Sequence, residues 1–250
     1  MEFDIRRHRL VLAAALLLYT GPAHGATLLI NQVTPHVGTY GYGLANWDDM
    51  TNALNAAFGV GNVTVSASPI GDISGYDRLW ITARQIGDPG LSAVEQANLL
   101  AFIASGKRVV IFGENNAWTA WNNSFLTILG GSFSGVDTGG ETITTAVVHP
   151  VTDGIPSIRA GDDGIAAGGT SLFSKNVVTL WGTNQNVITV LSLGMIDDSS
   201  DGFFPNNQAF KENLAQWLAA DAVEPVPEPS SCWLVAIGLA GALARYRQRP

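Results

Sequence analysis

Acidic and amide side chains follow two apolar segments that have the composition of buried strands. Glu114 and Asn115 come directly after the run Arg108–Phe112, and the pair Asp197 and Asp198 comes shortly after residues 187–193. The carboxyl ends of parallel strands meet at one edge of a sheet, so we expect these side chains to share a crevice that binds a ligand. Two carboxylates across such a crevice can act as a general acid and a general base.

Trp118 and His149 complete the candidate pocket. Trp118 offers an aromatic wall for a sugar or another polar ligand, and His149, which precedes Pro150, can act as a ligand or a base. A structural interpretation stays open for each of these residues. Glu114 and Asn115 can cap the next helix, the tryptophan can fill the core, the aspartates can stabilise a turn, and the histidine can be buried where a strand ends.

The elements that position these groups can be predicted from the middle of the chain. Leu79–Thr82 and Arg108–Phe112 are nearly continuous apolar runs, typical of strands covered on both faces. Ser92 and Glu95 have the spacing of a capping box, and Gly106 suits the left-handed position after the last helical turn. Strand, helix and strand therefore predict a right-handed βαβ unit, whose ligand-accessible edge carries the acidic turn.

Four helices are predicted. The first spans about 47–58 with Asn46 as its cap, the second follows Ser92 and turns Leu100 toward the sheet, and the third spans 121–129. The fourth spans about 207–219 and should cover one face of the sheet. Strand and helix alternate up to residue 130, after which a strand-rich section and the closing helix follow. This order predicts an α/β fold whose sheet is mostly parallel with some antiparallel strands.

Composition predicts one packed domain between two terminal segments, because the 250 residues are 46% hydrophobic. Residues 27–226 hold 7 Lys and Arg against 18 Asp and Glu, a net charge of about −11. Such a surface repels nucleic acid and anionic lipid headgroups. The single cysteine, Cys232, lies outside the domain, which therefore has no disulfide, no cysteine metal ligand and no thiol nucleophile.

A calcium loop is the one metal site that the sequence suggests. Asp197, Ser199 and Asp201 have the opening spacing of such a loop, but Gln208 occupies the twelfth position and no helix precedes it. We therefore expect a solvated turn here, with calcium as the open alternative, and we expect no other metal and no cofactor.

The first 26 residues have the pattern of a secretory signal peptide. Arg6, Arg7 and Arg9 precede the apolar run 10–18, and the small residues of 23–26 suit a cleavage site. The sequence therefore predicts export through the Sec machinery.

The C-terminal end of the chain has the pattern of a second targeting signal. Residues 222–231 form a proline-rich linker, residues 232–244 are an uncharged apolar segment that we expect to lie in the membrane, and residues 245–250 are basic. With Pro227, Glu228 and Pro229 before the apolar segment, this order resembles the PEP-CTERM sorting signal of Gram-negative bacteria. The resemblance implies recognition by an exosortase, removal of the tail, and delivery to the cell surface or an exopolysaccharide matrix. A plain membrane anchor is the alternative.

The domain itself, residues 27–221, resembles class I glutamine amidotransferases and more closely their trehalose-utilisation-type relatives. Three stretches carry this resemblance: Leu91–Asn116, Val148–Pro156 and Leu193–Trp217. The resemblance implies a flavodoxin-like three-layer sandwich. An amidotransferase needs a cysteine at the turn after the strand, yet that turn is Gly113–Asn115, and no catalytic His–Glu pair follows. Glutaminase chemistry is therefore excluded, and the pattern G-x-S-x-G of serine hydrolases is also missing.

Two functions from different classes stay open. The one we favour is a non-catalytic surface or matrix protein that binds glycan, another protein, or no small molecule. The alternative is a surface hydrolase or lyase that acts on polysaccharide, with Glu114 and either Asp197 or Asp198 as acid and base.

Overall fold

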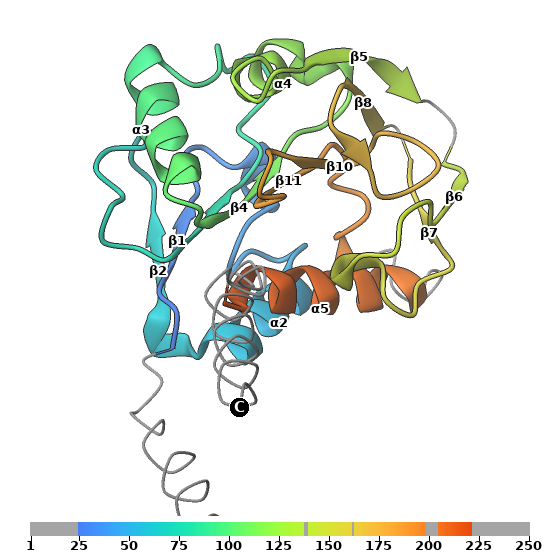
Figure 1. The fold of residues 1–250 in the computed structure, drawn as a ribbon, viewed down its shortest axis with the longest axis horizontal. Helices are drawn as coiled ribbons and strands as arrows, with labels where there is room; N and C mark the ends of the chain where they lie inside the picture. Colours follow the sequence, from blue (N-terminus) through green and yellow to red (C-terminus); the bar gives the residue numbers. More distant parts are fainter. Residues whose placement is uncertain (1–24, 138–139, 162, 199–204, 222–250) are drawn as a thin grey trace, which may run out of the picture.

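The computed structural model describes residues 25–137, 140–161, 163–198 and 205–221 (Figure 1). Its centre is a seven-stranded sheet in the order β2-β1-β3-β4-β11-β10-β9. The first five strands in this order run parallel to one another, and β10 and β9 complete the sheet in antiparallel pairing. The strands span Leu28–Asn31 (β1), Val63–Ser66 (β2), Arg78–Ile81 (β3), Arg108–Phe112 (β4), Thr170–Ser171 (β9), Val178–Trp181 (β10) and Val187–Val190 (β11).

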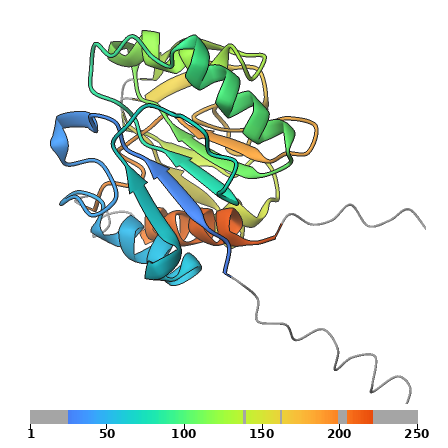
Figure 2. The ribbon, with the colours of Figure 1, turned by 90° about the vertical axis from the view of Figure 1, so that its left-hand side faces the viewer.

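Helices cover both faces of this sheet. Figure 2 shows α3 (Ala93–Ala104) and α4 (Thr119–Leu126) on one face, and α2 (Asp48–Phe58) and α5 (Pro205–Ala219) on the other. Side chains alternate along each strand, so each face has its own apolar core. The predicted α/β fold with a mostly parallel, flavodoxin-like sheet is confirmed.

Shorter elements complete the chain. Two small antiparallel sheets pair β5 (Ser132–Asp137) with β8 (Asp163–Ala167), and β6 (Thr142–Thr144) with β7 (Ser157–Arg159). Single turns of 3₁₀ helix span His36–Gly38 (η2), Val60–Asn62 (η3), Asn116–Trp118 (η4) and Pro150–Thr152 (η5).

The predicted βαβ unit is confirmed. Strands β3 and β4 are parallel neighbours, and both hydrogen bonds of the predicted capping box form between Ser92 and Glu95. Gly106 has φ +80°, as its position after the helix predicts. The predicted helix face was wrong at Leu100, which is 42% exposed, because α3 buries Glu95, Leu99 and Phe102 instead. Glu95 is buried because it pairs with the equally buried Arg84.

The N-terminus of α2 also differs from its prediction. Asn46 does not cap this helix, which begins at Asp48. The side chain of Asp198 accepts the N–H groups of Asp48 and Asp49 from 150 and 149 residues away. A distant carboxylate therefore does what a local cap was predicted to do.

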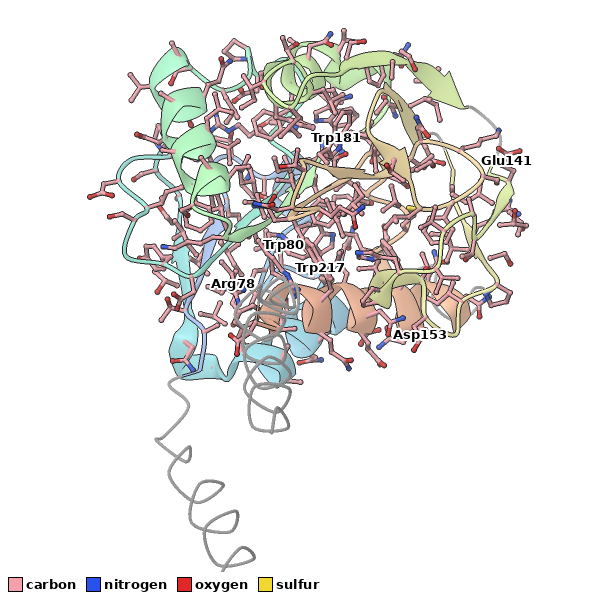
Figure 3. All side chains as sticks on the ribbon, in the orientation of Figure 1. Arg78, Trp80, Glu141, Asp153, Trp181 and Trp217 are labelled. Carbon is pink, nitrogen blue, oxygen red and sulfur yellow. The ribbon has the colours of Figure 1, made fainter. Side chains whose placement is uncertain are left out.

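Both ends of the described domain lie at the edge of the sheet where the parallel strands begin. Thr27 bonds the carboxylate of Asp77 through its N–H and its hydroxyl, each at 2.9 Å. Arg78 donates to the carbonyl groups of Leu218 and Ala220, and Figure 3 shows Arg78 beside Trp217 of α5. No described helix has the length and apolarity that crossing a membrane requires. The predicted segment 232–244 and residues 1–24 of the predicted signal peptide lie outside the described residues.

Candidate functional site

Glu114 lies at the opposite edge, where β4 ends. Its side chain is 7% exposed, and both of its carboxylate oxygens accept backbone N–H groups. One oxygen lies 2.6 Å from the nitrogen of Leu193, which follows β11, and the other lies 3.3 Å from the nitrogen of Asn115. The carboxylate therefore joins the ends of two neighbouring parallel strands.

The turn that carries Glu114 is tightly packed. Asn122 of α4 accepts the N–H of Glu114 at 3.2 Å and donates to the carbonyl oxygen of the same residue. A Cβ atom on Gly113 would lie 2.2 Å from Oδ1 of Asn122 and 2.6 Å from a methyl group of Leu191. Only glycine fits at this position without displacing its neighbours.

Aromatic side chains form one wall beside this turn. Trp118 is 5% exposed and donates its indole N–H to the carbonyl oxygen of Arg84 at 2.7 Å. The ring of His36 meets Trp118 edge-on with centroids 4.6 Å apart, and it stacks on Tyr40 at 5.5 Å. Burial lowers the pKa of His36, which favours the neutral imidazole at pH 7.

Tyr40 joins this wall to the second acidic segment. Its hydroxyl donates to Asp197 at 2.7 Å. Burial raises the pKa of Tyr40, and the hydrogen bond to Asp197 and the negative charges of Asp197 and Glu114 raise it further. The structure thus brings together Glu114, Trp118 and Asp197 from the predicted pocket, and it adds His36 and Tyr40.

The loop that carries His36 and Tyr40 was visible in the sequence as a glycine- and tyrosine-rich segment after the first strand. Its position after the carboxyl end of β1 was the signal that placed it at the ligand edge. The pocket prediction did not use this signal and missed both residues.

Two predicted pocket residues accept backbone N–H groups at the start of a helix instead. Asn115 accepts the N–H of Ala117 at 3.0 Å and so caps η4, as the structural alternative stated. Asp198 is directed to the N-terminus of α2 and lies 3.1 Å from the ammonium group of Lys211, which is fully buried in α5. Because the neighbouring Asp197 binds Tyr40, the two adjacent aspartates have separate partners.

The prediction that His149 joins the pocket was wrong. Its ring lies near Trp217, with centroids 6.0 Å apart, and Nδ1 accepts the N–H of Val151. Burial and the positive charge of Arg108, at the start of β4, lower the pKa of His149. The histidine is therefore at the opposite edge. The strand before His149, β6, is short and pairs with β7 in a separate sheet, so His149 does not follow a strand of the central sheet.

The donor set of the described residues does not favour a metal. None of their groups of His, Cys, Asp and Glu has three members placed to hold an ion. Ser199 and Asp201 of the calcium alternative lie outside the described residues. The site offers carboxylates, a phenol and aromatic rings, and no cysteine or serine stands at its turn.

Comparisons with known proteins give separate matches for the C-terminal tail and for the domain. Residues 225–248 match the model of the PEP-CTERM protein-sorting motif. This motif implies export, transient membrane anchoring through the C-terminal tail, and an exosortase as the processing partner. No curated protein matches the chain in sequence.

Solved structures resemble the domain in fold. The mmIFT52 N-terminal domain has a TM-score of 0.59 and 13% identity, with coverage of 78% of this chain and 99% of that one. A protein described as one of the GMP synthase subunits of Thermoplasma acidophilum has a TM-score of 0.52 and 10% identity, with 78% and 95% covered. A ThuA-like protein from Parabacteroides merdae overlaps more weakly, with a TM-score of 0.45, 15% identity, and 82% and 93% covered. These likenesses concern the fold alone.

Proposed function

We propose that this chain is an exported surface or matrix protein whose α/β domain binds a partner or ligand without catalysing a reaction. In this proposal residues 1–26 are a signal peptide read by the Sec machinery and residues 27–221 are the domain. Residues 222–231 are the linker, residues 232–244 cross the membrane until the tail is removed, and residues 245–250 are the basic end. The match at residues 225–248 supports the sorting step.

One observation carries the non-catalytic role. Acyl-transfer enzymes of this fold type keep a nucleophile at the turn and free N–H groups that stabilise the oxyanion. Here the turn holds Glu114, whose own carboxylate accepts the N–H groups of Asn115 and Leu193. The donors next to the turn are already bonded within the protein, so no preorganised oxyanion site is left at these two groups. The loss of an ancestral nucleophile is part of this proposal.

Intact-mass analysis and fractionation of the native host test the sorting step. The expected form begins near Thr27 and ends near Pro229, in the surface or extracellular fraction. A full-length chain in the cytosol would contradict this part of the proposal.

A second experiment separates binding from catalysis. Purified protein is incubated with polysaccharide, and new reducing ends and unsaturated products are measured. We expect neither. Release of products that stops in Glu114→Gln, but continues in the matched exposed-carboxylate variant Asp153→Asn, would favour the hydrolase or lyase.

The enzyme alternative has one specific observation in its favour. Tyr40 donates its hydroxyl to Asp197, and the negative charges of both Asp197 and Glu114 raise the pKa of this phenol. Such a pair can supply an acid and a base if the aromatic wall opens to admit substrate.

A further inference from the structure

The chain between β2 and β3 crosses one face of the sheet without a helix. Parallel strands are usually joined by a helix that covers the sheet. Residues 67–77 make this crossing with no helical turn, and Pro69, Gly71 and Gly75 are the reason. A thin loop therefore covers the sheet beside α3, where a helix would fill more space.

This loop is firmly held despite its lack of regular structure. Ile70 and Ile73 are 2% and 4% exposed and insert into the same core as Leu29 and Leu79. Glu95 of α3 accepts the N–H of Ile70, at 3.1 Å.

Two polar side chains hold three carbonyl groups of the loop. Asn98 donates to the carbonyl oxygen of Ile70 at 3.1 Å. Lys107 donates to the carbonyl oxygens of Ser74 and Tyr76. The loop is fixed at both ends, so its two sides are preorganised walls.

Two hollows lie along this loop and share Asp72 and Ile73. The first has a volume of about 230 Å³, and the second about 260 Å³. Each is smaller than the about 300–1,000 Å³ of sites for drug-sized ligands, which suits one small ring in each hollow. The residues that give the first hollow its polar character are Asn31, Ser66 and Tyr76; those of the second are Ser74, Asn98, Ser105 and Lys107.

Asn31 points to the kind of ligand. Its residue is 2% exposed, its amide nitrogen donates to the carbonyl oxygen of Ser68 at 2.8 Å, and its Oδ1 accepts no bond from any residue that the structure describes. A buried acceptor without a donor costs about 1–3 kcal/mol. Because Oδ1 itself lies below the accessible surface, a hydroxyl group in the first hollow would supply that donor once the Asn31 side chain turns toward the hollow.

The charges along the two hollows favour a neutral ligand. Hydrogen bonds from the backbone and the side chain of Ser74 lower the pKa of Asp72 and keep this exposed carboxylate ionised. Its negative charge repels polyanions. The only cation of the lining, Lys107, is already bonded to two carbonyl groups. Amides, hydroxyls and a tyrosine ring around a site with one charge of each sign match a polyhydroxylated chain.

We infer that the two hollows on either side of Asp72 and Ile73 bind adjacent units of a neutral carbohydrate chain. The inference rests on the proposed non-catalytic role and gives it a ligand class and a place. This place is separate from the acidic edge around Glu114, because it lies under the loop 67–77 on the face that α3 covers.

Affinity electrophoresis and calorimetry of the purified full chain test this inference, with dextran, malto-oligosaccharides and cello-oligosaccharides as neutral probes and alginate as a polyanion. We expect at least one neutral probe to bind more tightly than alginate. Tyr76→Ala should weaken this binding about tenfold through the loss of ring contacts. Ala101→Trp, at an exposed position of α3 that lines the second hollow, should weaken it by blocking that hollow.

Control variants separate blocked binding from lost folding. Val94→Ala changes another exposed side chain of α3 outside the hollows and should bind like the unmodified protein. Thermal unfolding of each variant identifies any that fail to fold, and Ala101→Trp alters no buried residue.

Three results would overturn the inference: no binding of any neutral probe, stronger binding of alginate, or binding that neither Tyr76→Ala nor Ala101→Trp weakens. Carbohydrate binding that is lost only in Glu114→Gln would place the ligand at the acidic edge. That result would overturn the inference about the two hollows and leave the proposed function intact. Cytosolic full-length protein or released reducing ends would contradict the proposed function and leave the inference about the two hollows intact.

Discussion

Replacement of Asp198 by alanine removes two interactions at once. The carboxylate accepts the N–H groups of Asp48 and Asp49 at the start of α2, and it lies 3.1 Å from the buried ammonium group of Lys211. This side chain therefore joins the segment after β11 to both helices on one face of the sheet.

The expected cost follows from these two parts. A lost helix cap costs about 1 kcal/mol, and removal of one partner of a buried ion pair costs about 3–5 kcal/mol. Asp49 lies 3.9 Å from the same ammonium group and keeps part of its stabilisation. We therefore expect Asp198→Ala to lower the free energy of unfolding by about 3–5 kcal/mol, a large share of the about 5–15 kcal/mol typical of a domain. Asp198→Asn keeps an oxygen for the helix, so about 2–3 kcal/mol should be lost.

Urea unfolding followed by tryptophan fluorescence measures these differences. In the double variant Asp198→Asn/Lys211→Met neither charge remains, so we expect it to be more stable than Asp198→Asn alone. The exposed Asp153, replaced by alanine, is the matched control and should stay within about 0.5 kcal/mol of the unmodified protein. Stability of Asp198→Ala equal to that of this control would show that the carboxylate does not hold the two helices. So would a double-mutant cycle of Asp198→Asn and Lys211→Met without coupling energy.

Three further predictions concern other parts of the domain. Burial raises the pKa of Glu95, but hydrogen bonds from Ser92, Arg84 and Ile70 outweigh it and hold the pKa below its ordinary value of 4.5. Its contribution to stability is complete above about pH 4.5 and is lost as the pH falls through the folded pKa, so Glu95→Gln should flatten the acid limb of a plot of unfolding free energy against pH. Gly113→Ala should lower the free energy of unfolding by about 1–3 kcal/mol because its Cβ meets Asn122. Gly61→Ala, at a position with open space, is the control, and equal stability of the two variants would argue against this packing. Arg78→Met should speed hydrogen exchange at the end of α5, whose carbonyl groups lose two donors; unchanged exchange there would show that Arg78 does not hold this end.

Elements whose signals are local could be predicted from the sequence. The capping box of Ser92 and Glu95, the glycine at 106 and the apolar runs on either side define strand, helix and strand within one short segment. The hairpin of β10 and β11 is likewise set by two apolar runs and one turn. In these segments the capping and turn residues indicate the same secondary structure as the spacing of the apolar residues, so the elements can be predicted from the segment itself.

The errors involve partners that the local apolar pattern does not reveal. Leu100 was turned to the wrong side because the pairing of Glu95 with Arg84 rotates a charged residue into the core. The role of Asp198 depends on α2, and that of Tyr40 depends on Asp197, 157 residues away. His149 was misplaced because the pattern of a strand does not reveal which sheet the strand joins.

The two arginines that begin β3 and β4 connect the end of α5 to the sheet, and this connection decides how force on the tail is transmitted. Arg78 holds the carbonyl groups of Leu218 and Ala220, and Arg108 holds those of Trp217 and Ala220. A pull on the chain beyond residue 221 reaches these guanidinium groups first and passes from them into the central strands β3 and β4, where load is shared by the whole sheet. The aromatic and acidic cluster lies at the far end of the same strands, so we expect tension on the tail to change its shape little.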